Sequence, residues 1–195
     1  MNNILLLGSS GLIGTCLCKN LLNMGYCIDA AGRKKTDNKN INFIEWDIFG
    51  SDIGRSGKLV SFYKAVIVSA WAGSGAEERN NEDINMSCAV ALGNQVKNIM
   101  EKCRIDQIIL IGSQAEYGRA YGNVGEDYVT DNNTLSSYGR AKLYLYESLK
   151  KSANGVILTE LRFHSVFGAF PAKRQMLQNS LYKICLLYTS DAADD

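Results

Sequence analysis

The stretch Ile4-Leu-Leu-Leu-Gly-Ser-Ser-Gly-Leu-Ile-Gly14 decides the fold, because it joins a short apolar run to three evenly spaced glycines and a helical pattern. We interpret it as a buried strand, a tight turn, and a helix whose free N–H groups point at an anion. Gly8 would form the turn, Gly11 would admit a phosphate, and Gly14 would let the helix pack on the strand. An ordinary strand–helix turn fits the same spacing, so the rest of the chain has to decide between them.

The length and composition of the chain are those of one globular domain. Its 195 residues are 46% apolar and 21% charged, with a formal net charge of +1. This balance gives no electrostatic argument for nucleic acid or an anionic membrane. No apolar stretch approaches the roughly 18 residues of a membrane span, and the N-terminus lacks the basic region and cleavage site of a signal peptide. We therefore expect no nucleic-acid or membrane partner.

Six cysteines lie inside apolar patterns, and no two of them have C-x-x-C spacing. The single histidine, His164, has no cysteine near it in the sequence. Small buried thiols in a reducing compartment explain this usage better than disulfides or a metal site. We predict a cytoplasmic protein without a metal centre.

Short apolar runs alternate with helical patterns along the chain. Strands are expected at residues 4–7, 26–31, 41–46, 65–69, 107–111 and 155–161, and helices at about 13–24, 80–102 and 136–152, with a further helical pattern after Pro171. Thr134 or Ser136 would cap the third helix, and residues 51–64 are ambiguous. The alternation predicts an α/β fold, a Rossmann-type doubly wound parallel sheet in the order 3-2-1-4-5-6.

Ligands bind such a sheet at the C-terminal ends of its strands. The second strand leads into Gly32-Arg33, where an NAD site would carry an acidic residue. Arg33 suits a 2′-phosphate, which slightly favours NADP(H) over NAD(H), and a solvated loop is the alternative. Asp47 and Ile48 follow the third strand, where the acid would accept a bond from adenine or simply face solvent.

Three residues near the fifth strand form a candidate catalytic group. Ser113 ends that strand, and Tyr138 and Lys142 lie one turn apart on the following helix. A free tyrosine titrates near pH 10, too high for proton transfer at neutral pH, and a nearby lysine favours its phenolate. Such a trio can move a proton at a carbinol while a nicotinamide moves the hydride.

Further motifs follow the strands in order: Ser69-Ala70-Trp71-Ala72, Asn85, Gly112-Ser113-Gln-Ala-Glu-Tyr117-Gly118, Tyr138-Gly-Arg-Ala-Lys142 and Leu161-Arg162-Phe163-His164-Ser165-Val166-Phe167-Gly168. With the glycine turn and Asp47-Ile48, this set resembles the NAD(P)-dependent epimerase/dehydratase family of the extended short-chain dehydrogenase/reductase superfamily. The resemblance covers nearly all of residues 3–170. It implies a nucleotide-linked sugar as substrate, with a homodimer as the candidate assembly.

The resemblance also implies a role for each position. Tyr138 would be the catalytic acid/base, Lys142 would lower its pKa and hold the nicotinamide ribose, and Ser113 would bind the substrate oxygen. Asn85 would support the catalytic helix. The cofactor would contact Gly8, Ser10, Gly11, Leu12, Ile13, Gly14, Arg33, Asp47, Ile48, Ala70, Trp71, Ala72, Tyr138 and Lys142. The substrate would contact Ser113, Glu116, Tyr117 and His164. A packing role suits His164 equally.

One departure from the family pattern bears on the reaction. Sugar 4,6-dehydratases of this family carry an Asp-Glu pair directly after the catalytic Ser/Thr, whereas this chain has Gln114 and Ala115. A reductase or an epimerase therefore fits better than a dehydratase. The alternatives are a non-catalytic NAD(P)-binding regulator or sensor and a reductase of a small carbonyl compound.

The last residues form a segment of different character. Residues 185–195 resemble the translation of a sequencing adapter, which indicates a non-native tail, and a natural acidic terminus is the alternative. We expect an NAD(P)-binding domain over 1–170, the start of a substrate lobe over 171–184, and this tail. On this interpretation most of the substrate lobe is missing and the chain itself is poorly active.

Overall fold

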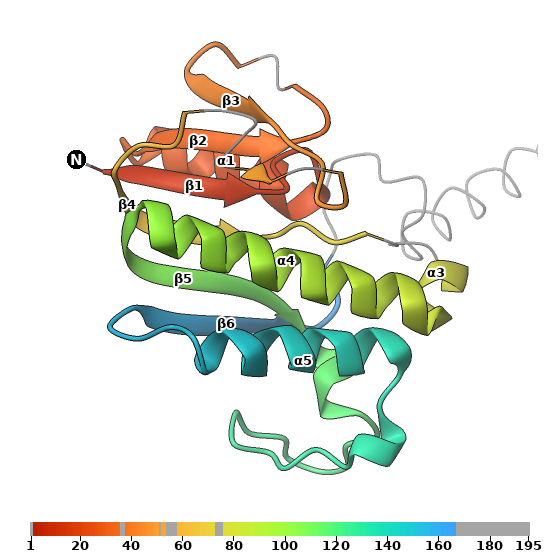
Figure 1. Ribbon diagram of the computed structural model, residues 1–195. Coiled ribbons are helices and arrows are strands. Elements are labelled where there is room, and N and C mark those ends of the chain that lie inside the picture. Colours follow the sequence, from red (N-terminus) through yellow and green to blue (C-terminus); the bar gives the residue numbers. More distant parts are fainter. Residues whose placement is uncertain (1, 36–37, 51, 54–57, 73–75, 167–195) are drawn as a thin grey trace, which may run out of the picture. The chain divides into compact units, whose positions relative to one another are not determined.

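The computed structural model describes residues 2–35, 38–50, 52–53, 58–72 and 76–166. The chain divides into two compact units, Met1–His164 and Ser165–Asp195. The helix expected after Pro171 and the segments 171–184 and 185–195 lie outside the described residues. The first unit contains the sheet (Figure 1).

Six strands form one parallel sheet in the order β3-β2-β1-β4-β5-β6, which confirms the predicted topology. The strands are β1 (Asn3–Leu7), β2 (Cys27–Gly32), β3 (Ile41–Glu45), β4 (Phe62–Val68), β5 (Arg104–Ser113) and β6 (Ile157–Phe163). The chain order reverses between β1 and β4, so their C-terminal ends flank the switch point where doubly wound sheets bind ligands.

Helices cover both faces of this sheet. They are α1 (Leu12–Asn23), α3 (Ala76–Asn80), α4 (Glu82–Lys102) and α5 (Ser137–Lys150), with short 3-10 helices η1 (Gln114–Tyr117) and η2 (Asn132–Thr134). In Figure 1, α4 and α5 run side by side in front of the sheet and α1 lies behind it.

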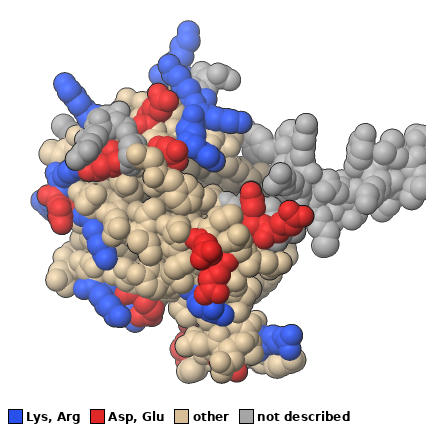
Figure 2. Space-filling view, turned by 45° about the vertical axis from the view of Figure 1, so that its right-hand side comes forward, with Lys and Arg blue, Asp and Glu red and all other residues tan. Residues whose placement is uncertain are grey.

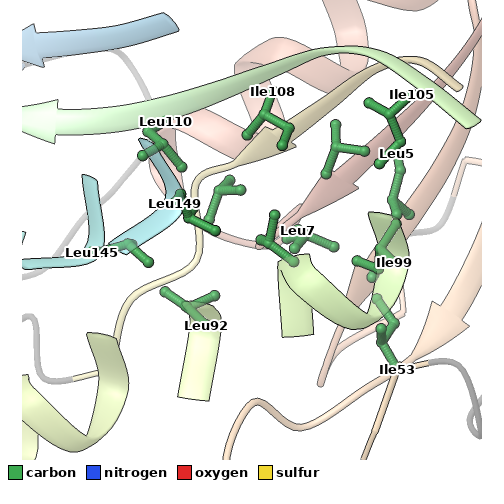
Figure 3. Close-up of a cluster of buried hydrophobic side chains, with 14 of the residues drawn as sticks. Leu5, Leu7, Ile53, Leu92, Ile99, Ile105, Ile108, Leu110, Leu145 and Leu149 are labelled. Atoms are coloured by element: carbon green, nitrogen blue, oxygen red, sulfur yellow. The ribbon is translucent and has the colours of Figure 1, made fainter. Parts of the chain in front are cut away.

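Alternation along β1 divides the core into two layers, because successive strand residues point to opposite faces. Leu5 and Leu7 join the cluster under α4 and α5, whereas Ile4 and Leu6 join the cluster under α1. Figure 3 shows the first cluster, in which side chains of α4 and α5 meet those of β1 and β5. A fully buried side chain such as Leu92 contributes about 1.5–3 kcal/mol. This packing fixes α5 beside the end of β5.

Strand β4 begins three residues earlier than the predicted start. Tyr63 is fully buried, and its hydroxyl donates to Asp29 at 2.5 Å. Asn42 donates to the other oxygen of Asp29 at 2.9 Å. The sequence leaves residues 51–64 ambiguous because polar Lys64 interrupts the apolar run, and the hydrogen bonds that tie Tyr63 to the sheet come from residues far along the chain.

Helix α4 confirms the helix predicted over about 80–102, and the separate short helix α3 precedes it, with Asn81 between the two. The Asn81 side chain caps α4 by accepting the Ile84 N–H at 3.0 Å. Ser136 caps α5 by accepting the Gly139 N–H at 3.1 Å. Thr134, the other predicted cap, instead accepts the Arg119 N–H at 3.0 Å and closes the base of a loop.

The surface carries charges of both signs, as Figure 2 shows for one face. Among the helices that the structure describes, none is long and apolar enough to cross a membrane. Within the same residues, no group of three or more His, Cys, Asp or Glu side chains is arranged to hold a metal ion.

Candidate functional site

The glycine turn between β1 and α1 has the geometry that its sequence predicts. Gly8 has φ +92°, and a Cβ there would lie 2.5 Å from the Ala70 backbone nitrogen. A Cβ on Gly14 would lie 2.1 Å from the Gly8 carbonyl oxygen. Gly11 is the N-cap residue of α1 and has no side chain to cap it. The N–H groups of the first turn, which Leu12 and Ile13 begin, are therefore not capped from within the turn.

The residues at this turn fit a phosphate-bearing dinucleotide. Ser9 is 5% exposed, and its hydroxyl has no hydrogen-bond partner among the described residues. The Ser9 and Ser10 hydroxyls face the end of β2, since a Cβ on Gly32 would lie 3.5 Å and 4.0 Å from them. Arg33 follows Gly32 directly and is exposed. An uncapped helix N-terminus and an unpaired hydroxyl therefore lie where such a ligand binds, and Arg33 follows the end of the neighbouring strand. Sequence reasoning missed Ser9, whose unpaired hydroxyl has no sequence signal.

Asp47 and Ile48 lie beside the end of β2, because the Trp46 N–H donates to the Gly32 carbonyl at 3.0 Å. Asp47 is exposed and its carboxylate accepts the Phe49 N–H at 3.3 Å, which forms a tight turn. Ile48 packs partly against the core. The structure thus brings Asp47 to the expected edge of the sheet.

The structure brings Ser113, Tyr138 and Lys142 together at the end of β5. The Ser113 and Tyr138 side chains hydrogen-bond to each other. The Lys142 ammonium lies 5.7 Å from the centre of the Tyr138 ring and donates to the Ile111 carbonyl at 2.8 Å. These contacts span residues 111 to 142, and α5 supplies both Tyr138 and Lys142 on one face, as their spacing predicts.

Gly139 makes this meeting sterically feasible. A Cβ on Gly139 would lie 2.1 Å from the Ala115 carbonyl oxygen, so the first turn of α5 packs directly on the backbone of η1. Since Ser113 caps η1 and Tyr138 precedes Gly139, this contact sets the separation of the two catalytic candidates. Sequence reasoning missed Gly139, although a glycine inside a predicted helix is an available signal.

The electrostatics of Tyr138 differ from the expectation. Burial raises the pKa of Tyr138, while the positive charge of Arg79 and the hydrogen bond with Ser113 lower it. The Arg79 guanidinium lies 5.2 Å from the centre of the Tyr138 ring. Burial also lowers the pKa of Lys142 to about 8, against the opposing influence of Glu116 and Cys88. The prediction names Lys142 as the residue that lowers the pKa of the tyrosine and does not include Arg79, which lies 59 positions before Tyr138 in the chain.

Glu116 is predicted to contact the substrate, but in the structure its side chain lies inside the protein. It is fully buried, and its carboxyl accepts the Ser113 N–H at 2.6 Å. Arg162 approaches the other oxygen at 3.4 Å and pairs with Glu160 at 2.9 Å. Burial and the neighbouring Glu160 raise the pKa of Glu116 to about 8. The short η1 helix directs the Glu116 side chain into the protein. There its carboxyl holds the Ser113 backbone in place through the hydrogen bond with the Ser113 N–H.

Tyr117 and His164, the other substrate candidates, are neighbours. Their ring centres lie 6.5 Å apart. Tyr117 is 9% exposed, with Tyr128 edge-on at 6.1 Å and the Arg162 guanidinium 4.8 Å from its ring centre. His164 is exposed. Tyr117 is thus largely packed, and His164 is the accessible member of the pair.

The segment after β4 supplies Ala70, Trp71 and Ala72. The Ala72 N–H donates to the Cys88 sulfur at 3.2 Å, and the Trp71 indole N–H donates to Asn85 at 3.0 Å. Asn85, expected to support the catalytic helix, bonds to Trp71, which contacts Tyr138 and Lys142 of that helix.

A Rossmann-type sheet with a glycine turn at β1 and a Ser–Tyr–Lys group at β5 defines a class of dinucleotide-binding α/β proteins. The model of the NAD dependent epimerase/dehydratase family matches residues 4–185, and the chain belongs to this family. A search of curated protein sequences gave no match.

Solved structures with the same fold are similar over most of this chain. MoeE5 in complex with UDP-glucose and NAD shares 22% identity, with a TM-score of 0.74 over 86% of this chain and 56% of that one. A UDP-galactose 4-epimerase shares 20% identity, with a TM-score of 0.70 over 82% and 55%. UDP-glucuronic acid 4-epimerase from Bacillus cereus, in complex with NAD, shares 25% identity, with a TM-score of 0.65 over 85% and 57%. The chain therefore spans little more than half the length of these structures.

Proposed function

We propose that the chain is the dinucleotide-binding part of an NAD(P)-dependent oxidoreductase or epimerase that acts on a nucleotide-linked sugar. The observation that carries the proposal is that Ser113, Tyr138 and Lys142 come together at the C-terminal edge of the sheet. The glycine turn after β1 lies at the same edge. Family membership supports the nicotinamide nucleotide. The similar structures include MoeE5 in complex with UDP-glucose and NAD and a UDP-glucuronic acid 4-epimerase in complex with NAD, and these support the substrate class.

The residues of this chain would perform binding and proton transfer. A bound nicotinamide supplies the acceptor or donor of a hydride. The turn at Gly8 and Gly11 would hold its phosphates on the N-terminus of α1. The Tyr138 phenol oxygen would take the proton from a sugar hydroxyl, or return it to the carbonyl oxygen, while the Ser113 hydroxyl orients that oxygen. The charges of Arg79 and Lys142 favour the phenolate that Tyr138 needs.

The same geometry favours reduction or epimerisation over elimination of water. Elimination needs an acid and a base beyond the tyrosine. Gln114 and Ala115 carry no such groups, and the nearby Glu116 is fully buried with its carboxyl bonded to the Ser113 N–H. We propose NADP(H) as the slightly preferred cofactor because of Arg33, and a cytoplasmic location because the five described cysteines are free thiols.

The test is Tyr138→Phe, assayed in a form of the chain extended to the length of its structural relatives. We expect turnover of a nucleotide sugar with NAD(H) or NADP(H) to fall about 10²- to 10⁴-fold, because proton transfer loses its group. NADH affinity, followed by fluorescence, should stay within about twofold. Tyr144→Phe is the matched control, because Tyr144 lies on the same helix and is 45% exposed. Unchanged turnover in Tyr138→Phe would reject the catalytic assignment, and absence of NADH and NADPH binding would reject the function.

A further inference from the structure

The Lys142 ammonium lies in a place where water cannot solvate it fully. The residue is 7% exposed, and the ammonium donates to the Ile111 carbonyl at 2.8 Å. An ammonium has three N–H donors, and a buried charge needs compensation for the hydration that it loses. One backbone carbonyl supplies only part of that compensation.

The indole ring of Trp71 supplies a second contact. The Lys142 nitrogen lies 4.1 Å from the centre of this ring, well inside the range of a cation–π interaction. Tryptophan has the most favourable ring face for a cation, and the interaction is strongest when the ammonium is desolvated. The centre of the Tyr138 ring is farther from the same nitrogen, at 5.7 Å.

Asn85 fixes the orientation of this indole. The Trp71 indole N–H donates to the Asn85 side-chain oxygen at 3.0 Å. Asn85 is fully buried, and its amide nitrogen donates to the carbonyls of Asn81 at 2.7 Å and Glu78 at 2.9 Å. Because the nitrogen side of the amide is committed to carbonyls, the oxygen side must face Trp71. The ring is thereby held at one angle.

The same indole also contacts the candidate acid/base. The rings of Trp71 and Tyr138 meet edge-to-face, with centres 5.5 Å apart and an interplanar angle of 88°. This is a favourable aromatic geometry that restricts rotation of the phenol. One side chain from the end of β4 therefore touches both functional residues of α5.

We propose that Trp71 is a positioning residue that holds the Lys142 ammonium charged and beside Tyr138, with its own angle set by Asn85. The catalytic importance of this contact rests on the proposed function. The contact between Trp71 and Lys142 itself can be tested by a measurement that does not require enzyme activity. This positioning role differs from the expected cofactor role of Trp71, because it assigns the indole to the protein's own lysine.

Other titratable groups act on Lys142 and must be held constant in the test. Glu116, Cys88 and Glu160 favour the charged ammonium, and Arg79 disfavours it. None of these is changed in the variants below, so a difference between variants reports the indole.

The experiment follows the titration of Lys142 by NMR in the cofactor-free 195-residue chain labelled with [13Cε]lysine. The resonance of Lys142 is assigned by its loss in Lys142→Met. In Trp71→Leu, which is apolar but has no π face, we expect the Lys142 pKa to fall by about one pH unit. In Trp71→Phe, which keeps a smaller ring, we expect a smaller fall. Trp46→Phe is the control, because Trp46 is a buried tryptophan at the end of β3, and it should leave the Lys142 titration unchanged.

The outcomes separate this inference from the proposed function. A Lys142 titration that is the same in wild type, Trp71→Phe and Trp71→Leu overturns the inference, as does a fall of equal size in Trp46→Phe. Chemical-shift dispersion in the same spectra establishes that each variant is folded. If Lys142 responds to Trp71 while Tyr138→Phe retains full turnover, the positioning contact stands and the catalytic assignment fails.

Discussion

Replacing Glu116 with glutamine is expected to remove a pH dependence of stability that this buried carboxyl creates. Burial and the adjacent Glu160 raise the pKa of Glu116 from 4.5 to about 8, although the Ser113 N–H and Arg162 act in the opposite direction. The folded protein therefore binds this proton more tightly than the unfolded chain. As the pH rises above 4.5, the unfolded carboxyl releases its proton first, so the free energy of unfolding falls until about pH 8.

The size of the effect follows from the same difference. One pKa unit corresponds to 1.36 kcal/mol, so the contribution of Glu116 falls by about 1.4 kcal/mol per pH unit within this window, or about 3 kcal/mol between pH 5 and pH 7. Glu116→Gln keeps an oxygen for the Ser113 N–H and cannot ionise. Relative to wild type, the variant should therefore gain about 3 kcal/mol of stability over the same interval.

Urea unfolding at pH 5, 6 and 7 measures this difference, since the other titrating groups are common to both proteins. Glu101→Gln is the control, because Glu101 is exposed on α4 and should leave the pH profile unchanged. Parallel profiles for wild type and Glu116→Gln would show that Glu116 is already ionised in the folded protein, and the reasoning from burial would be wrong.

Three further substitutions give separate tests. Arg33→Ala should weaken NADPH binding about tenfold and leave NADH binding within about twofold, because only NADPH carries the 2′-phosphate; equal losses in fluorescence titrations would remove the basis for the NADP(H) preference. Gly139→Ala should cost about 1–3 kcal/mol in urea unfolding, because its Cβ would meet the Ala115 carbonyl at 2.1 Å; wild-type stability would contradict the close packing of α5 on η1. Tyr63→Phe should cost about 1–3 kcal/mol in thermal unfolding, because Asp29 loses a buried donor; an unchanged midpoint would mean that water replaces the hydroxyl.

The sheet was predictable because its signals are local. Apolar runs such as 4–7 and 107–111 alternate with helical periodicity, and the right-handed crossover rule leaves few topologies. Tyr138 and Lys142 were predictable as neighbours because residues four positions apart lie on the same face of an α-helix. Ser113 could be added because the ends of parallel strands meet at one edge.

The remaining features depend on contacts that sequence spacing does not encode. Arg79 reaches Tyr138 through the break between α3 and α4, and that break follows from the Asn81 cap rather than from a change in hydrophobic pattern. Glu116 looks like an accessible acid beside Ser113, yet the tight η1 turn directs it inward to the Ser113 N–H. A polar residue's direction within a short turn is set by backbone geometry, which periodicity does not report.

The closed base of the loop between Gly118 and Thr134 has a consequence for how this protein can diverge. Arg119 donates to Thr134 there, and Gly118 has φ +61° with space for no Cβ, since one would lie 2.3 Å from the Thr134 hydroxyl. Because this hydrogen bond holds the two ends of the loop together, the positions of Ser113 and Tyr138 depend on the base of the loop and not on its length or path. Doubling the length of a flexible loop costs only about 0.6 kcal/mol of closure entropy. Insertions near the open turn at Gly122 can therefore be tolerated while Ser113 and Tyr138 keep their separation.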